Sequence, residues 1–375
     1  MDVWTGLLLA GMSFAGVGLG LTLFGALPLR WRRVFCSPHR QRDIHQARIP
    51  RVGGITIIPI SLISMWLAIR WGILASDLPW SGIIWGALMV LGYGVWDEQQ
   101  DLSWKVQLII QISIGVVLVA SGVTIAGIMI PFGELWNLQS VLWQAGSLTL
   151  YPLSAAVTLL WVVGLMNVVN WLDGLDGLAA GTGIIAFGTL AILATTPFVG
   201  QTHITLISLI LLGSYAGALW FNWYPAKIFL GTSGSMYLGY MLAVLSLMSG
   251  GKIGTSALVF AVPILDAGIV IIRRMLAGTL IFEADKRHLH YGLLSLGWSQ
   301  VQVVGLLYGV SVFFGICALL FDTVGKFIVF VLGAGVLVGL TVWIKTQHQP
   351  ESSVPAKIWY NKNNGNHQKQ YETRI

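Results

Sequence analysis

Long apolar stretches alternate with short polar segments along almost the whole chain. A run of about 20 apolar residues is what a helix needs to cross the hydrocarbon of a bilayer. Backbone groups in lipid must pair with one another, and a helix satisfies its own, so these runs predict helices and not strands. We predict an all-α polytopic membrane protein with eleven spans, at residues 3–27, 55–75, 81–96, 106–122, 155–171, 178–196, 204–222, 232–248, 257–276, 302–321 and 324–344.

The composition agrees with this pattern. Hydrophobic residues make up 56% of the chain and charged residues 10%, and the mean hydropathy is +0.78. A soluble domain carries about 25% charged residues. We therefore expect one transmembrane domain over residues 1–344, followed by a polar cytoplasmic tail, 345–375, that is disordered. Cys36 and Cys317 fall in different predicted layers, and we expect no disulfide between them.

Basic residues indicate the orientation. If the N-terminus lies outside, all of the 21 Lys and Arg residues except Arg70, Lys252 and Lys326 fall on the cytoplasmic side. Cytoplasmic segments of membrane proteins carry such an excess. We predict an outside N-terminus and a cytoplasmic C-terminus. The net charge of +6 reports this topology, so it does not argue for nucleic-acid binding.

The most informative polar stretch follows the fifth predicted span. It runs from Asn167 to Gly181 and reads NVVNWLDGLDGLAAG. On a continued helix Asn170, Asp173 and Asp176 would share one side, because they are three residues apart. Polar groups in hydrocarbon cost several kcal/mol unless they are paired, hydrated or bound to a metal. The doubled Asp-Gly favours a functional site over a capped helix end.

A pair of acids follows directly on the third predicted span, where a cytoplasmic loop, 97–105, is predicted to begin. Asp97 and Glu98 begin the segment DEQQDLSWK, which Lys105 closes. Paired carboxylates can bind Mg²⁺, and one of them can act as a base. The alternative is a solvated helix end.

Three further polar segments are candidates for binding phosphate. In FLGTSGS, Gly231 and Ser233 would offer backbone N–H groups at a helix start, unless the serines are only caps. The other two segments, HQARIPRVGG and EADKRHLHY, contain basic clusters; in the first, cytoplasmic charge alone is a sufficient explanation. These clusters are His45, Arg48 and Arg51, and Arg287, His288 and His290.

The two histidines are two residues apart, which does not favour a zinc site on one helix face. Asp266 lies inside the ninth span, in PILDAG. An acid within a span is a functional candidate by default. We rank a structural role higher, either as a partner of Arg273 or as a cap of a neighbouring helix.

Taken together, these segments resemble the polyprenyl-phosphate N-acetylhexosamine-1-phosphate transferases. NVVNWLDGLDGL is similar to that family's NxxNxxDGxDGL signature, GVWDEQQDLSWK to its paired-acid motif, FLGTSGS to FLGDxGS and RHLHY to its histidine motif. IPRVGG and PILDAG also match, so the resemblance covers about residues 38–300. Eleven spans resemble the WecA/TagO-like branch, which takes UDP-N-acetylglucosamine; the branch that takes UDP-N-acetylmuramoyl-pentapeptide usually has ten.

The resemblance implies transfer of a sugar 1-phosphate, expected to be N-acetylglucosamine 1-phosphate, from a UDP-sugar to polyprenyl phosphate. UMP leaves, and the cofactor is Mg²⁺, with Mn²⁺ as the alternative. The expected partners are the membrane, polyprenyl phosphate and the UDP-sugar. Whether the protein forms a homodimer is not implied either way. The implied sites are catalytic Asp97, Glu98 and His288, metal-binding Asn170 and Asp173, and substrate-binding Asp176, Lys105, His45, Arg48, Gly231, Ser233, Arg287 and His290.

Within this scheme Asp97 is the expected base on the lipid phosphate, and a covalent phospho-Asp97 is the alternative. Three positions depart from the family pattern. Glu98 stands for a second Asp, Tyr291 for a His, and Thr232 for the Asp of FLGDxGS, which in the family helps to bind Mg²⁺. A hydroxyl is a poor substitute for an anionic oxygen ligand.

Other functions remain as alternatives. Thr232 motivates a catalytically impaired homologue that binds lipid phosphate or a partner. A phospho-N-acetylmuramoyl-pentapeptide transferase is a second alternative. A transporter is disfavoured, because the acids cluster on one predicted face and not at mid-membrane. A CDP-alcohol phosphotransferase needs an Arg after the Asp-Gly pair, where Gly181 stands.

Overall fold

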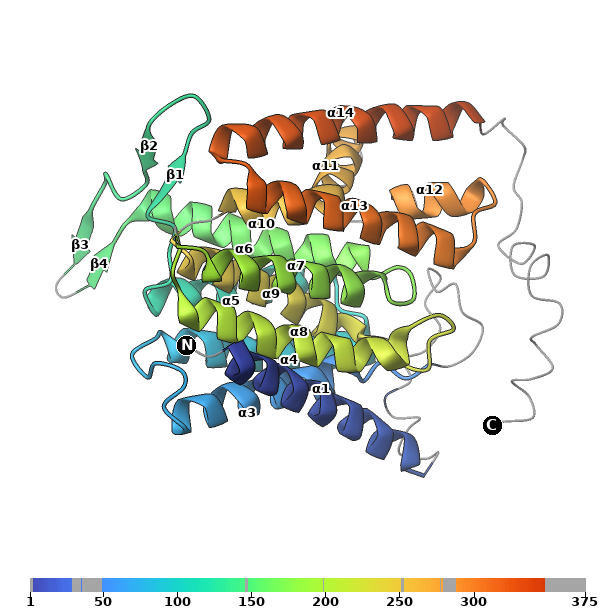
Figure 1. Cartoon of the computed structure of the whole chain (residues 1–375). Helices are drawn as coiled ribbons and strands as arrows, with labels where there is room; N and C mark the ends of the chain where they lie inside the picture. Colours follow the sequence, from blue (N-terminus) through green and yellow to red (C-terminus); the bar gives the residue numbers. More distant parts are fainter. Residues whose placement is uncertain are drawn as a thin grey trace.

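The computed structural model describes residues 3–28, 35, 49–145, 148–197, 199–250, 253–276, 278 and 288–347. Helices lie side by side and form most of the molecule (Figure 1). The polar tail falls outside the described residues from residue 348 onward, so its predicted disorder stays a prediction. Helix α14 continues to Gln347, three residues beyond the predicted end of the last span.

Each predicted span coincides with a helix of the structure. Ten of the spans correspond to one helix each: α1 (Val3–Ala26), α3 (Gly53–Arg70), α4 (Trp80–Gln100), α5 (Trp104–Ala120), α6 (Pro152–Leu172), α7 (Leu178–Thr195), α8 (Thr202–Asn222), α9 (Gly231–Met248), α13 (Gln300–Leu320) and α14 (Thr323–Gln347). The ninth span is broken into α10 (Ile253–Val259) and α11 (Ala261–Leu276), which meet at an angle of 82°. A short helix, α12 (Leu289–Ser295), lies between α11 and α13 in the sequence and was not predicted.

Within the described residues, seven helices are long and apolar enough to cross a membrane, or eight if the bent pair counts as one span. Helix α5 has only 17 residues, and α4 and α9 carry polar residues at one end. In α14 only 11% of the most apolar window is buried in the protein, and in α1 22%. Apolar helices so exposed are stable in lipid. The chain is a multi-pass membrane protein, while the count of eleven and the orientation stay predictions.

Helix α9 is the central helix. Every residue from Gly231 to Leu247 is buried, and the helix packs against α3, α4 and α6. Glycines allow this close approach: a Cβ on Gly94 of α4 would overlap the backbone of Ser233, and one on Gly54 of α3 would overlap the backbone N of Gly234. Small residues at helix contacts are typical of membrane bundles. The start of α9 is therefore tightly held by its neighbours.

The segment between α5 and α6, which falls between two predicted spans, contains two small antiparallel hairpins. Strand β1 (Gly127–Met129) pairs with β2 (Leu135–Asn137), with Ile128 opposite Trp136. Strand β3 (Trp143–Ala145) pairs with β4 (Leu148–Leu150), with Gln144 opposite Thr149. Apart from these two hairpins the described elements are helices, in agreement with the predicted all-α class. Strands of three residues are too short for an alternating pattern to be recognised.

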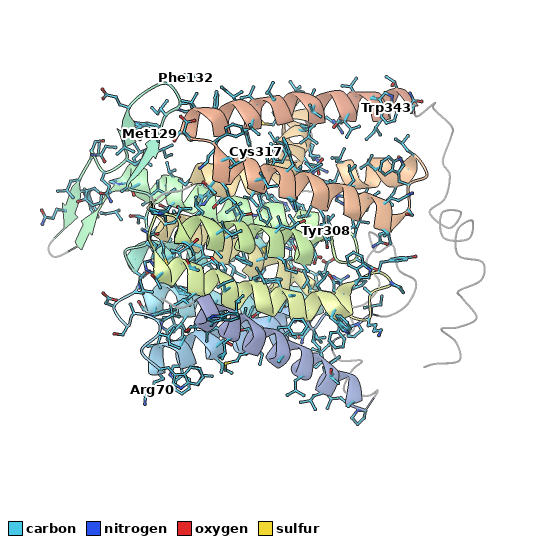
Figure 2. All side chains as sticks on the ribbon, viewed as in Figure 1. Arg70, Met129, Phe132, Tyr308, Cys317 and Trp343 are labelled. Carbon is cyan, nitrogen blue, oxygen red and sulfur yellow. The ribbon has the colours of Figure 1, made fainter. Side chains whose placement is uncertain are left out.

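The hairpins mark one end of the bundle. The N-terminal end of α1 lies at that end, and α12 lies at the opposite end (Figure 1). Figure 2 shows Arg70, Met129 and Phe132 at the hairpin end. Arg70 is one of the three basic residues predicted for the outer side. Cys317 is buried and free, whereas Cys36 lies outside the described residues.

Candidate active site at the start of helix α9

Asp97 and Glu98 lie in the last turn of α4, which continues to Gln100. The prediction that a loop begins at residue 97 is therefore wrong by one helical turn. The next residue, Asp101, caps the C-terminal end of the helix, and its φ of 49° lies in the left-handed region. Both acids are buried, with 2% of Asp97 and 7% of Glu98 exposed. Burial excludes the alternative of a solvated helix end.

The carboxylate of Asp97 is held by donors from two helices. Its Oδ2 accepts a hydrogen bond of 2.8 Å from the hydroxyl of Thr232 in α9. Its Oδ1 accepts from Gln107 Nε2 of α5 at 2.9 Å and from the backbone N of Leu102 at 3.2 Å. Charge-assisted hydrogen bonds of this kind fix a side chain more firmly than neutral ones. Gln107 was not among the predicted site residues.

Glu98 occupies the N-terminal end of α9. The backbone N of Ser233 donates to Glu98 Oε1 at 3.4 Å. Gly231 has a φ of +74°, and a Cβ there would overlap the same oxygen, so glycine is required on both grounds. A helix start favours a negative charge. We predicted a phosphate at this position, but the structure places the Glu98 carboxylate there.

Asn170 of α6 reaches the same turn. The Ser235 hydroxyl donates to Asn170 Oδ1 at 2.9 Å, and it also lies 3.1 Å from the carbonyl of Gly231. Ser235 is therefore not a cap of α9, and neither is Ser233, because no side chain caps this helix. The first turn of α9, Gly231–Ser235, thus contacts two acids of α4 and an amide of α6.

Asp173 and Asp176 do not continue the helical face of Asn170. Helix α6 ends at Leu172, and residues 173–177 form a turn, so the predicted three-residue spacing on one helix is wrong beyond Asn170. The backbone ends its helix here because two Asp-Gly pairs follow, and glycine favours turns over helix. Burial raises the pKa of Asp173 to about 7, the nearby charge of Arg51 lowers it, and that of Asp176 adds to the rise.

Asp176 holds a neighbouring loop. Its Oδ2 accepts a hydrogen bond of 3.0 Å from the backbone N of Ala226, between α8 and α9. The next residue, Gly177, donates to Asn222 Oδ1 at 3.1 Å, and its carbonyl accepts from the hydroxyl of Tyr308. These contacts give Asp176 a structural role in the turn, beside the substrate-binding role that the resemblance implies.

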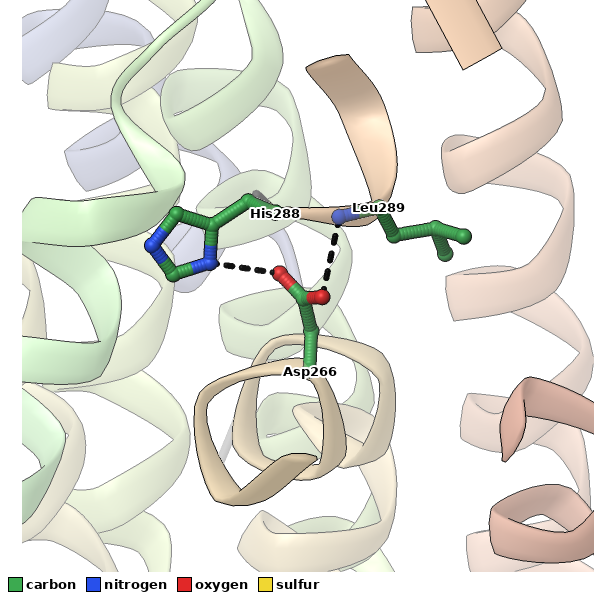
Figure 3. A network of polar contacts seen from close by, with 3 residues as sticks. All are labelled: Asp266, His288 and Leu289. Carbon is green, nitrogen blue, oxygen red and sulfur yellow. Dashed lines mark hydrogen bonds and ion pairs between the residues drawn. The ribbon is translucent and has the colours of Figure 1, made fainter. Parts of the chain in front are cut away.

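The histidines lie beside the Asp-Gly turn. His290 is 2% exposed, and its Nε2 is buried without a hydrogen-bond partner among the described residues. A Cβ on Gly174 would lie 2.7 Å from that nitrogen. His288 Nδ1 lies 2.8 Å from Asp266 Oδ2 (Figure 3). Asp266 also accepts from the backbone N of Leu289, so the predicted cap is confirmed, and the contact with His288 was not foreseen.

The basic residues are only partly described. His45, Arg48 and Arg287 lie outside the described residues. Arg51 stands where residues 51 and 229 form a parallel bridge, close enough for its charge to act on Asp173. Arg51 belongs to the basic cluster around IPRVGG in the sequence, but it was not among the predicted substrate-binding residues. Lys105 is exposed, with its Nζ 5.7 Å from the ring centre of Trp104.

A divalent cation fits the chemistry of these donors. Asp97, Glu98, Asp173 and Asn170 offer carboxylate and amide oxygens, the ligands that Mg²⁺ prefers. In the part of the chain that the structure describes, no three His, Cys, Asp or Glu side chains converge as a complete metal site. Mg²⁺ is usually held by one or two carboxylates together with water and substrate phosphates. The magnesium site therefore stays a prediction.

Comparison with known proteins supports the motif assignment. The model of glycosyl transferase family 4 matches residues 80–250. The chain is 33% identical over 305 residues to the probable undecaprenyl-phosphate N-acetylglucosaminyl 1-phosphate transferase of Bacillus subtilis strain 168, covering 78% of this chain and 79% of that protein. It is also 33% identical over 335 residues to the decaprenyl-phosphate N-acetylglucosaminephosphotransferase of Mycobacterium leprae, covering 81% and 82%.

A more distant group is also similar. The phospho-N-acetylmuramoyl-pentapeptide-transferase of Anoxybacillus flavithermus is 30% identical over 278 residues, covering 71% of this chain and 82% of that protein. The family model spans the paired acids, the Asp-Gly turn and the start of α9. The family predicted from the motifs is confirmed: this chain belongs to glycosyl transferase family 4.

Proposed function

We propose that this protein transfers N-acetylglucosamine 1-phosphate from UDP-N-acetylglucosamine to a polyprenyl phosphate and releases UMP, as the first membrane step of a cell-envelope glycan. One observation carries the proposal: Asp97, Glu98 and Asn170 meet at the first turn of α9 in a chain of this family. The Bacillus and mycobacterial relatives bear names for this transfer. The pentapeptide transferase is the runner-up, since its relatives are less similar over less of the chain.

The transfer exchanges one P–O bond for another. An oxygen of the lipid phosphate attacks the β-phosphorus of the UDP-sugar, the bond to the α-phosphate breaks, and UMP leaves. Asp97 takes the proton of the lipid phosphate in this scheme. Thr232 and Gln107 hold its carboxylate in place, so little reorganisation is needed. A covalent phospho-Asp97 is the alternative route.

Both reacting phosphates are anionic, so the site needs positive charge. Arg51 would supply part of this positive charge, since its charge already acts on Asp173. His288 and Arg287 would contact the diphosphate. Asn170 and Asp173 would hold Mg²⁺, or Mn²⁺ in its place. The bound ion would neutralise charge on the phosphoryl oxygens. We place this site at the cytoplasmic surface, as the distribution of Lys and Arg indicates.

The test is an assay of UMP release by the purified protein in detergent with undecaprenyl phosphate. UDP-N-acetylglucosamine, UDP-N-acetylmuramoyl-pentapeptide and other UDP-sugars are compared, each with and without Mg²⁺. We expect release with UDP-N-acetylglucosamine that EDTA abolishes and Mg²⁺ restores. Release with the pentapeptide donor alone would establish the runner-up. Equal release without divalent ions would remove the metal from the proposal.

Thr232 favours a second candidate, a homologue that binds lipid phosphate or a partner without catalysing transfer. Its hydroxyl stands at the position of the family's Asp and is bonded to Asp97. The same assay distinguishes the two when UDP-N-acetylglucosamine binding is measured in parallel by calorimetry. Binding without UMP release for any donor would support the second candidate. Turnover would exclude it.

A further inference from the structure

Asp266 is an acid in the apolar helix α11, in the second turn after the break between α10 and α11. The side chain is 14% exposed, so it is largely removed from water. A carboxylate in such a position must be compensated by nearby donors. Each of its two carboxylate oxygens contacts one hydrogen-bonding group. One lies 2.8 Å from Nδ1 of His288, and the other accepts from the backbone N of Leu289 at 2.9 Å.

These two contacts have different effects. The bond from Leu289 satisfies a backbone donor at the start of α12, where His288 is the N-cap. The bond to His288 selects a tautomer. An ionised carboxylate only accepts hydrogen bonds, so the proton of the imidazole lies on Nδ1. The nitrogen that can contact a ligand is then Nε2. Figure 3 shows it on the far side of the ring, directed away from Asp266.

Two other rings lie beside the ring of His288. The Trp171 ring of α6 lies at a centroid distance of 6.2 Å, and the His290 ring is parallel to within 5° at 5.8 Å. Trp171 is two residues before Asp173, and His290 adjoins Gly174 in the same turn. Asp266 therefore orients a ring that stands beside the Asp-Gly turn of the candidate site.

We propose that Asp266 is a positioning residue for the transfer: through His288 Nδ1 it fixes the tautomer and orientation of the imidazole, so that the imidazolium form donates from Nε2 to the diphosphate of the bound UDP-sugar. The inference rests on the proposed function for the role of His288. It adds a residue from the broken helix to the site, and it makes the α11–α12 contact part of the catalytic geometry. Partners that orient a functional histidine typically contribute about 10–100-fold.

The decisive variant is Asp266→Asn. Its amide oxygen can still accept from Leu289, whereas its NH₂ group donates to Nδ1. This moves the ring proton to Nε2 and disfavours the imidazolium, in which Nδ1 also carries a proton. We expect UMP release to fall about 10–100-fold in kcat with little change in KM. Asp266→Glu keeps an acceptor and should recover part of the rate. In a His288→Ala background, Asp266→Asn should cost nothing further, because the two residues act as a unit.

A purely structural role gives a different pattern. The Asn substitution would then lower the rate by the same factor with or without His288, and that additivity would overturn the inference. Nitrogen NMR of ¹⁵N-histidine-labelled protein supplies a readout that does not need turnover, with His288→Ala identifying the signals. We expect Nδ1 to be the protonated nitrogen of neutral His288 in the wild type, and Nε2 in Asp266→Asn. If the neutral His288 ring of the wild type carries its proton on Nε2, the inference is wrong.

The two failures are distinguishable. Wild-type protein that turns over no donor overturns the proposed function, and the NMR result still decides the tautomer. Active wild type with an impaired His288→Ala variant and an unimpaired Asp266→Asn variant overturns the inference alone. If the Asn variant does not fold, the wild-type spectrum and the Glu variant remain decisive.

Discussion

The hydroxyl of Thr232 donates a hydrogen bond of 2.8 Å to Asp97 Oδ2, across 135 residues of sequence. A neutral donor holds this buried carboxylate without adding a second negative charge. An acid at position 232 would instead face Asp97 as a like charge, which is unfavourable unless a cation lies between them. The residue that departs from the FLGDxGS pattern therefore has a defined task in this chain, which is to hold the Asp97 side chain.

Removing the Thr232 hydroxyl should impair transfer. Thr232→Val has nearly the same shape but leaves Asp97 Oδ2 without this donor, and a hydrogen bond to a charged group contributes about 1.5–3 kcal/mol. We expect UMP release to fall by roughly 10–100-fold. Thr232→Ser keeps the hydroxyl and should stay within a few-fold of wild type. Equal rates for the Val and Ser variants would show that the hydrogen bond does not matter.

Thr232→Asp tests the same position with opposite chemistry. If Thr232 is a weakened metal ligand, this substitution should leave activity equal or higher. The contact with Asp97 predicts a loss, together with a steeper dependence on Mg²⁺, because a cation would have to separate two carboxylates. A magnesium titration of UMP release measures both. Higher activity at every magnesium concentration would favour the weakened-ligand interpretation.

Asp97→Asn should abolish most of the transfer while the protein still folds. General bases contribute roughly 10²–10⁴-fold to rates, and an amide cannot replace one. Asp101→Asn is the matched control: this acid is exposed one turn beyond, and Asn tolerates its left-handed backbone. The control should keep its activity and its thermal midpoint. Near wild-type turnover in Asp97→Asn would remove this side chain from the mechanism.

Two glycines of α4 provide a packing test. A Cβ on Gly94 would overlap the backbone of Ser233, whereas one on Gly92 would meet no atom within 4 Å. Gly94→Ala must push α9 away from the acids, so we expect a loss of about 1–3 kcal/mol in stability and most of the activity. Gly92→Ala should be neutral or slightly stabilising. Thermal midpoints in detergent and UMP release measure both effects. Similar behaviour of the two variants would contradict the close contact of α4 and α9.

His290 should make stability depend on pH. Burial lowers its pKa to about 4, so between about pH 6.5 and 4 the unfolded chain binds a proton that the folded protein does not. Stability is therefore lost as the pH falls through this range, by up to about 3 kcal/mol. Thermal midpoints measured from pH 7 to 4 should fall less steeply in His290→Gln than in wild type. Parallel curves for the two proteins would contradict a buried neutral His290.

The helices could be predicted because their signal is local. A run of apolar residues long enough to span a bilayer can be recognised from that run alone, without knowing what packs against it. Every predicted span therefore coincides with a helix or, between residues 257 and 276, with a broken one. Short hairpins and the 82° break carry no such signal. They depend on contacts with other helices.

The candidate site was only partly predictable for the same reason. Asp97, Glu98 and Asn170 stood out because polar residues next to apolar spans are costly. Gln107 did not stand out, since one Gln near the start of a span is ordinary. Its role depends on the hydrogen bond that it donates to Asp97, which the sequence does not show. The roles of Asp176 and Asp266 also depended on partners 50 and 22 residues away.

The amino-acid sequence alone determined that this chain enters a membrane repeatedly and which polar segments stand at the ends of its helices, because burial in lipid imposes length and composition on each segment separately. The tertiary structure decided that these ends meet at the first turn of α9, that Thr232 holds Asp97, and that Asp266 orients His288. Those relationships arise from side chains of different helices satisfying one another away from water, and no single segment contains both halves of such a pair.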